Sequence, residues 1–100
     1  MIYDDDIITA INSRRKLKIS YKKTGDRTIC PHVLYISAMG KKTIDAYQTS
    51  GYSETDKLPE WKSFNVSEIG ELSALKDTFD IAPEYNPSNK EKYVTIIARV

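Results

Sequence analysis

The first apolar residues of the chain recur with helical spacing, directly after three aspartates at positions 4–6. These apolar residues are Ile7, Ile8, Ala10 and Ile11. Spacing of i, i+3 and i+4 places side chains on one side of a helix, and acidic residues are favourable at a helix N-terminus. The pattern therefore predicts a helix from Asp4 to about Arg14, with basic residues where it ends.

The next segment alternates strictly between apolar and polar residues, which predicts a strand over 16–22 with Leu17, Ile19 and Tyr21 on one face. A turn at 23–26 leads into a return strand that starts at Arg27. If Thr24 and Gly25 are the central turn residues, Tyr21 faces Thr28, Ile19 faces Cys30 and Leu17 faces His32. Arg27 then lies on the outer face with Lys18 and Lys22. A slip of one residue reverses this assignment.

Shorter apolar and polar patterns complete the expected fold. Pro31 marks an edge or a kink, 33–36 is apolar on both sides, and 43–48 predicts a third strand with Ile44 and Ala46 pointing inward. We expect a surface loop over 50–60, a strand over 61–66, an irregular segment over 80–92 and a final strand over 93–100. Residues 67–79 fit both a helix and a strand, and the spacing of their apolar residues slightly favours a helix. The order predicts one mainly β (α+β) domain over 1–100, a small sheet or barrel with an N-terminal capping helix.

Composition fits a globular domain, because 40% of the 100 residues are hydrophobic and 29% are charged. The sequence contains no apolar run of about 20 residues and no signal-peptide pattern at its start, so we expect a cytoplasmic protein without a membrane segment. Cys30 is the only cysteine, which excludes an intrachain disulfide.

The net charge of +1 conceals a strong segregation of charge along the chain. Residues 14–42 contain nine basic residues and one acidic residue, a balance of +8, whereas 43–89 contain three basic and nine acidic residues, a balance of −6. Basic side chains on one strand can follow a phosphate backbone, and tyrosine or tryptophan rings can stack on bases. The candidate phosphate contacts are Arg14, Arg15, Lys18, Lys22 and Arg27, and the candidate stacking residues are Tyr47 and Trp61.

Candidate catalytic chemistry is weaker. Cys30 and His32 share a strand face if the segment is regular, which would suit a nucleophile and a base, but a buried thiol and a half-buried or surface imidazole are the commoner arrangement. The three consecutive aspartates cannot all converge on one ion, and the four glycines form no phosphate loop. We expect a non-enzymatic binding module with no catalytic residue, metal or cofactor.

The order of several short motifs resembles the WYL domain, a small Sm-like β-barrel of bacterial transcriptional regulators and phage-defence accessory proteins. The resemblance covers about 7–79 and rests on 10–15, 17–21, 27–31, 46–47 and 64–69. It implies a regulatory module, often dimeric, that senses a ligand or binds nucleic acid. It also implies a strand over 70–75, and it adds Tyr21 to the candidate site beside Arg27 and Tyr47.

Two departures from the family concern its ligand surface. The Trp-Tyr-Leu that names the family aligns with Lys42-Thr43-Ile44, and Asn65 and Glu68 replace its two arginines. Trp61 and Lys62 can substitute in part. Two functions therefore remain open: binding of single-stranded RNA, DNA or a nucleotide-like ligand, and a protein-interaction or homodimerisation module in which the acidic half of one chain meets the basic half of another.

Overall fold

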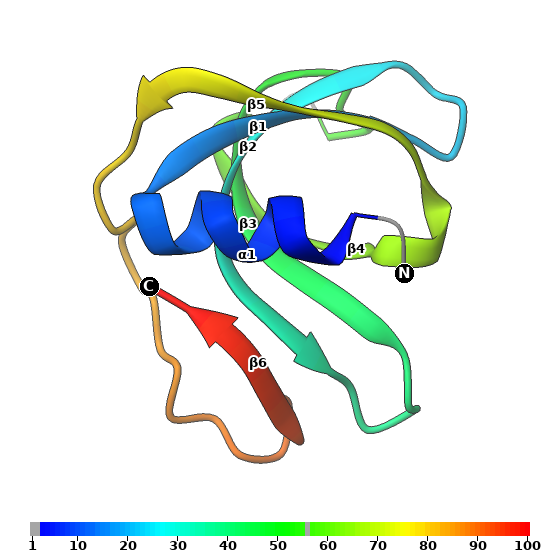
Figure 1. The fold of residues 1–100 in the computed structure, drawn as a ribbon. Helices are drawn as coiled ribbons and strands as arrows, with labels where there is room; N and C mark the ends of the chain where they lie inside the picture. Colours follow the sequence, from blue (N-terminus) through cyan, green and yellow to red (C-terminus); the bar gives the residue numbers. More distant parts are fainter. Residues whose placement is uncertain (1–2, 56) are drawn as a thin grey trace.

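The expected N-terminal helix is present as α1 (Asp4–Ser13) in the computed structural model, which describes residues 3–55 and 57–100 (Figure 1). Its three aspartates occupy the first turn, where free backbone N–H groups favour acidic side chains. Arg14 ends the helix in the left-handed conformation with φ of 51°, and its backbone N–H returns to carbonyl oxygens of the last turn. The buried face of the helix consists of Ile7, Ala10 and Ile11.

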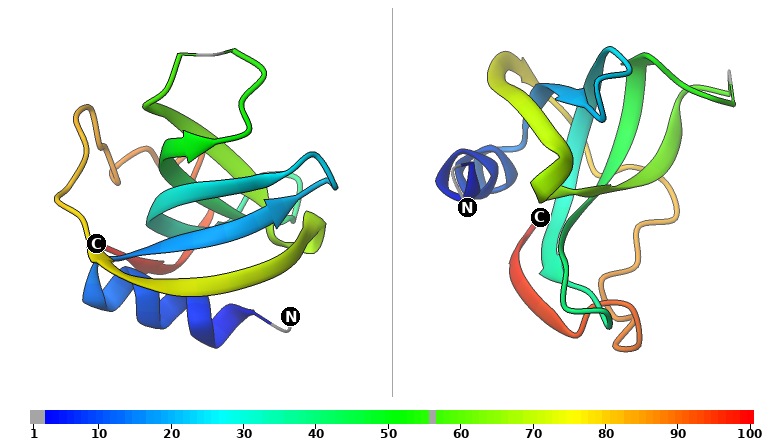
Figure 2. Two further views of the ribbon diagram at one scale, coloured as in Figure 1. Left: turned by 90° about the horizontal axis from the view of Figure 1, so that it is seen from above. Right: turned by 90° about the vertical axis from the view of Figure 1, so that its right-hand side faces the viewer.

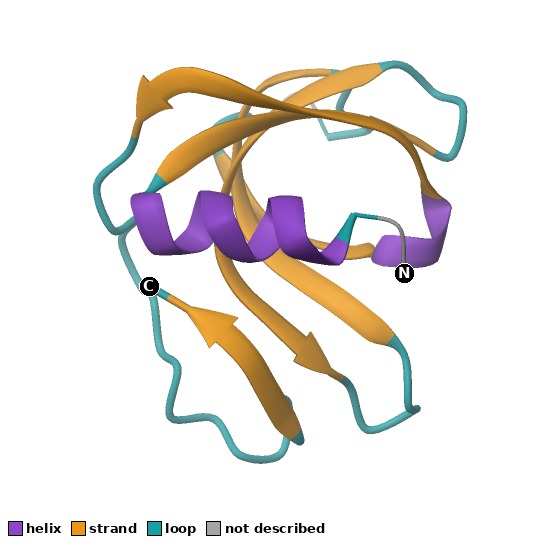
Figure 3. Cartoon of the chain, in the orientation of Figure 1, coloured by secondary structure: helices purple, strands orange, loops and turns teal. Residues whose placement is uncertain are grey.

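The described remainder is mainly β (Figure 3). Its elements are β1 (Arg15–Tyr21), β2 (Asp26–Ile36), β3 (Lys42–Gly51), β4 (Glu60–Asn65), the 3₁₀ turn η1 (Val66–Glu68), β5 (Ile69–Thr78) and β6 (Thr95–Arg99). All strand pairs are antiparallel. The sheet follows the order β4-β3-β2-β1-β5, and β6 pairs with β2. Within the described residues no ladder joins β4 to β5, so the sheet is open rather than a closed barrel.

The long strand β2 changes partner at Pro31, the residue at which an edge or a kink was predicted. Its first half pairs with β1 as far as Ile29, and its second half pairs with β6 from Val33 onward. The register with β3 also shifts between Pro31 and Val33. Because proline has no backbone N–H, it suits a position between two ladders.

The predicted register of the first hairpin is wrong. Leu17 pairs with Ile29 and Ile19 pairs with Arg27, so the return strand is shifted by three residues from the expected pairing. A shift by an odd number of residues moves its side chains to the opposite face. The cause is the turn, because Lys22 and Lys23 both take a positive φ (51° and 58°), and the N–H of Thr24 bonds to the carbonyl oxygen of Tyr21. Two successive left-handed residues form the tight turn that fits strand twist, but glycine or asparagine is the usual signal for it. Arg27 consequently points inward, away from Lys18.

The slight helical preference over 67–79 is also wrong. After η1, residues Ile69–Thr78 form β5 and pair with β1 along most of their length. Ile69 is buried and Leu72 packs against the core, whereas the residues between them are exposed. Tertiary pairing with β1 therefore overrides the apparent helical spacing. A strand over 70–75 is what the family resemblance implied.

The sheet has two faces with different coverings (Figure 2). The inner face packs against α1 and forms the core, from residues that include Leu17, Ile19, Ile29, Leu34, Ile44 and Phe64. Residues 79–94, here called the connecting segment, cross the opposite, outer face between β5 and β6. This segment has no helix or strand, as expected for 80–92. The described chain contains no helix that is long and apolar enough to cross a membrane.

Candidate functional site

A row of side chains crosses four neighbouring strands on the outer face. Cys30 pairs with Tyr47, and Tyr47 pairs with Trp61, so these three side chains share a face. Continuing the β1–β2 register by one residue places Lys16 opposite Cys30. Burial raises the pKa of the Cys30 thiol, and the positive charge of Lys16 opposes that rise. This effect of Lys16 agrees with its position beside Cys30. The row therefore joins a basic strand to two aromatic rings.

The aromatic end of the row is half-buried and ordered by contacts. The ring centroids of Tyr47 and Trp61 lie 5.5 Å apart at an interplanar angle of 64°. The indole N–H of Trp61 donates to the carbonyl oxygen of Pro83 at 2.8 Å. This bond fixes the indole against the connecting segment.

The basic end of the row extends along β1. Lys18 pairs with Thr28 on the same outer face, and its ammonium lies 3.4 Å from the Asp26 carboxylate with both groups more than half exposed. Arg14 and Arg15 are exposed at the start of β1. Lys22 is exposed in the turn after it, about 23 Å from Arg15 at strand spacing. Two of the predicted phosphate contacts thus lie in β1 and two lie directly beside its ends, and the Lys22 ammonium is 5.6 Å from the ring centroid of the inward-facing Tyr21.

Three predicted site residues lie on the inner face instead. Tyr21 is buried, its hydroxyl oxygen accepts from the backbone N–H of Asn65 at 2.9 Å, and its ring packs edge-on against Phe64. Lys62 pairs with Ala46, and its ammonium donates to Ser53 Oγ at 3.1 Å. Tyr21 is therefore separated from the outer row, whereas Lys62 lines the same pocket as Trp61.

Arg27 is the third inward-facing residue, and only 6% of it is exposed. Its guanidinium lies 5.1 to 5.5 Å from three ring centroids, and one Nη donates to Thr24 Oγ1 at 3.1 Å. The three rings are those of Tyr21, Tyr52 and Phe64. A cation held over aromatic faces inside the fold has a structural role. The expected outer-face position of Arg27 is therefore corrected.

His32 is also corrected, because it is fully buried rather than half-buried or at the surface. Its Nδ1 lies 2.7 Å from the carbonyl oxygen of Cys30, and its Nε2 lies 3.0 Å from the backbone nitrogen of Ala82. A carbonyl only accepts and a backbone N–H only donates, so Nδ1 carries the proton and Nε2 accepts. Burial lowers the pKa of His32, the bond to Cys30 opposes this, and the charge of Arg14 adds to the lowering. Both ring nitrogens are occupied, so His32 does not serve Cys30 as a base.

Sequence analysis missed a buried carboxylate on β3. Asp45 Oδ1 accepts from the Tyr35 hydroxyl (2.9 Å) and from Ser63 Oγ (2.6 Å). Its Oδ2 accepts from the Tyr93 hydroxyl (2.7 Å) and contacts the Lys92 ammonium (2.6 Å). Burial acts to raise the pKa of Asp45, but the four donors together hold it below the usual value. Burial and the bond to Asp45 raise the pKa of both tyrosines.

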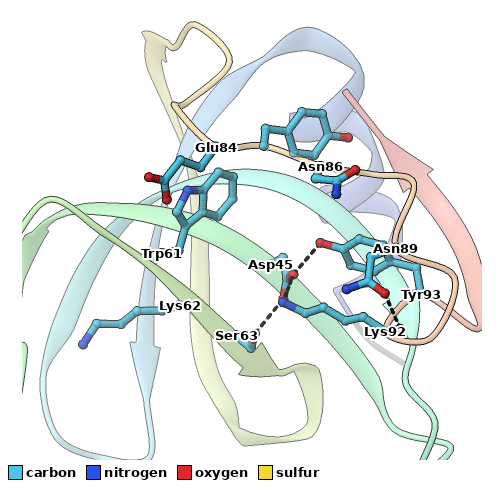
Figure 4. A pocket seen from close by; sticks show the side chains of 10 residues that line it. Asp45, Trp61, Lys62, Ser63, Glu84, Asn86, Asn89, Lys92 and Tyr93 are labelled. Carbon is cyan, nitrogen blue, oxygen red and sulfur yellow. Dashed lines mark hydrogen bonds and ion pairs between the residues drawn. The ribbon is translucent and has the colours of Figure 1, made fainter.

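A pocket of about 310 Å³ opens beside this carboxylate, between the outer face and the connecting segment (Figure 4). Trp61 lines it as well as ending the row described above. Asp45 lies between the inward-facing Ile44 and Ala46, and strand alternation therefore places it on the outer face. Its partners Lys92 and Tyr93 are 47 and 48 residues away in the sequence. The sequence signal was an acidic residue between the two inward-facing apolar residues Ile44 and Ala46.

Comparison with models of known protein families finds none that matches this chain, and comparison with curated proteins finds none either. Within the described residues, no group of three histidine, cysteine, aspartate or glutamate side chains has the geometry of a metal site.

Proposed function

We propose that this protein is a non-enzymatic regulatory binding module whose outer sheet face contacts single-stranded nucleic acid or a nucleotide-like ligand. The observation that carries the proposal is the row Lys16–Cys30–Tyr47–Trp61, in which a basic strand and an aromatic pair share one face of four neighbouring strands. Proteins that bind single strands without strong sequence preference combine these two features.

The roles follow from charge and exposure. Lys18 is exposed on the outer face of β1, and Arg14 and Arg15 are exposed where that strand begins, so the three cations suit contacts with neighbouring phosphates. Tyr47 and Trp61 contact each other edge-on, and Tyr85 stacks on Trp61, so packing fixes both rings. Both residues are half-buried, and the part of each ring that remains exposed is the part offered to a base. Lys22 extends the basic line at the far end of β1. Tyr21 and Arg27 support the fold from the inner face and are not part of the proposed contact. Lys62 is not part of it either, because its ammonium contacts Ser53 and Glu60.

We also propose that the fold is a WYL-like, Sm-like barrel whose sheet is curled but not closed by a ladder. The two ends of the sheet order, β4 and β5, are joined by only the three residues of η1. Such a link spans at most about 14 Å, so the ends of the sheet curve toward each other. The N-terminal helix and the strand over 70–75 agree with this family, and its regulatory role supports a binding function.

The test is fluorescence anisotropy with labelled single-stranded RNA and DNA of about twelve nucleotides at low salt. We expect Arg15→Glu/Lys18→Glu to weaken binding at least about tenfold, because each removes a phosphate contact and adds repulsion. Tyr47→Ala should weaken it at least about fivefold through lost stacking. Lys41→Glu/Lys57→Glu changes the net charge equally at exposed sites away from β1 and should bind within about twofold of wild type. Equal loss in both double variants would reduce the effect to net charge and contradict the proposed face.

Homodimerisation is the second candidate, and β6 is the observation that favours it. Among the described strands β6 pairs only with β2, and Val94, Ile96 and Ile97 are 57%, 38% and 40% exposed. An exposed apolar edge strand can pair with the same strand of a second copy. The segregated charges would favour such a contact. Sedimentation velocity should then show a dimer that Ile97→Lys converts to monomer; a monomer at all concentrations would exclude this function.

A further inference from the structure

The pocket beside Asp45 has a chemistry that the basic strand does not explain. Its volume of about 310 Å³ lies at the lower end of the range for small-molecule sites. Figure 4 shows Trp61 and Glu84 on one side, Asn86, Asn89 and Tyr93 on the other, and Asp45 with Ser63 between them. The Lys62 side chain points away from Asp45. Tyr85 also lines the pocket and stacks on Trp61, with ring centroids 6.2 Å apart at an interplanar angle of 17°. The pocket thus has an aromatic side, a polar side and a floor formed around Asp45.

The floor presents hydrogen-bond acceptors. The four acceptor positions of the Asp45 carboxylate are all occupied by the donors described above, so the carboxylate itself has no room for a ligand. Ser63 and Tyr93 commit their hydroxyl hydrogens to Asp45. Their oxygens therefore offer only lone pairs to the pocket, which suits a ligand that donates from hydroxyl groups.

The polar side presents donors. Asn86 Oδ1 accepts from the N–H of Ser88 at 3.1 Å, and Asn89 Oδ1 accepts from the N–H of Lys92 at 3.2 Å. In both residues the local turn uses the oxygen, which leaves the amide NH₂ group as a donor. The ammonium of Lys92 contacts Asp45, but its side chain is 44% exposed and has further N–H groups. This side suits an anionic group rich in acceptors.

We infer that this pocket binds a nucleoside 5′-monophosphate, or the terminal nucleotide of a strand, with its base against the aromatic side formed by Trp61 and Tyr85. The ribose hydroxyls donate to the oxygens of Ser63 and Tyr93, and the phosphate accepts from Asn86, Asn89 and Lys92. Glu84 lies on the side of Trp61, so it repels a phosphate there and accepts from an exocyclic amine of the base. The inference deepens the proposed function and rests on it, because it names a subsite at the aromatic end of the same outer face.

Intrinsic fluorescence provides the test, because Trp61 is the only tryptophan of the chain. We expect saturable quenching by adenosine 5′-monophosphate. Adenosine lacks the phosphate and its hydrogen bonds, and ribose 5-phosphate lacks the base and its stacking. We expect each to bind at least about tenfold more weakly than adenosine 5′-monophosphate. Equal response to ribose 5-phosphate would show an anion site without a base subsite and would overturn the inference.

Matched variants locate the binding. Asn86→Asp and Asn89→Asp keep the oxygen that each turn uses but replace the donor with a negative charge, so each should weaken adenosine 5′-monophosphate at least about tenfold. Asn12→Asp makes the same change on the exposed face of α1 and should have no effect. Wild-type affinity in both pocket variants would overturn the inference.

The pocket inference and the proposed role of the basic strand can be tested separately. Arg15→Glu/Lys18→Glu should keep mononucleotide affinity within about twofold while it loses oligonucleotide affinity. If millimolar mononucleotide causes no saturable quenching while oligonucleotides still bind, the pocket inference is overturned and the proposed face stands. If mononucleotide binds and the pocket variants abolish it while no oligonucleotide binds, the pocket inference stands and the basic strand loses its proposed role.

Discussion

Asp45 shows how one buried side chain organises a surface. It lies on β3, is almost fully buried, and holds together two tyrosines, a serine and a lysine from three separate parts of the chain. A buried carboxylate without donors is strongly unfavourable, whereas one with all acceptor positions filled is stable and rigid. Its position thus fixes the connecting segment against the outer face.

We predict that Asp45→Asn lowers the free energy of unfolding by about 2–4 kcal/mol, because an amide NH₂ would face donors and Lys92 would lose its counter-ion. Urea denaturation at pH 7 measures this, with the exposed Asp26→Asn as a matched control. The folded-state pKa of Asp45 is lowered, so its contribution is present above the ordinary value of 3.8 and is lost as the pH falls below it. The difference between wild type and variant should therefore shrink in that acidic range. A difference that is unchanged there would contradict the role of its charge.

Arg27 and Lys18 carry the same charge in adjacent strands but lie on opposite faces. We predict that Arg27→Glu lowers the free energy of unfolding by at least about 2 kcal/mol, because it places an anion among three aromatic rings. Lys18→Glu should change it by no more than about 0.5 kcal/mol, because the side chain is exposed. Equal effects in thermal or urea denaturation would contradict the observed hairpin register.

At the scale of elements, the sequence pattern predicted those features that depend on neighbouring residues in the chain. The helix over 4–14 and the inward faces of the strands at Leu17, Ile19, Ile44 and Ala46 are confirmed. The hairpin register failed because two lysines adopt left-handed geometry without a glycine signal. The strand β5 was missed by spacing alone because its partner β1 lies some 50 residues away. Non-local pairing leaves only a weak trace in sequence.

The connecting segment depends on the neutral form of His32, because Nε2 accepts from the Ala82 N–H. The pKa of His32 is lowered in the folded state, so below pH 6.5, its ordinary pKa, the unfolded chain binds more protons than the folded chain. Stability is therefore fully present above pH 6.5 and should fall as the pH decreases below it, by up to about 1.4 kcal/mol per pH unit. Urea denaturation between pH 7.5 and 5.5 measures this loss.

His32→Gln supplies the control for this prediction, because a glutamine oxygen can accept from Ala82 but does not titrate. His32 is the only histidine of the chain, so the variant should lose the pH dependence in this range. An equally steep dependence in the variant would assign it to other groups and contradict the role of His32.

At the scale of the whole molecule, the basic strand β1 and the connecting segment share the outer face of the sheet. Sequence analysis identified the basic residues and Trp61, but it could not divide them between two faces, since that division depends on the hairpin register. It could not identify the pocket either. Asp45, Trp61 and Tyr93 come from distant positions, and only the folded sheet brings them together.

The measurement that tests the central claim most directly is the affinity of wild-type protein for a labelled single-stranded oligonucleotide between 50 and 200 mM salt. Release of counter-ions by three or four phosphate contacts along β1 gives a slope of log K against log salt between about −2 and −3. The account therefore predicts a loss of affinity of about 16- to 64-fold across this range. Absence of binding at the lowest salt, or binding that does not change with salt, would contradict it.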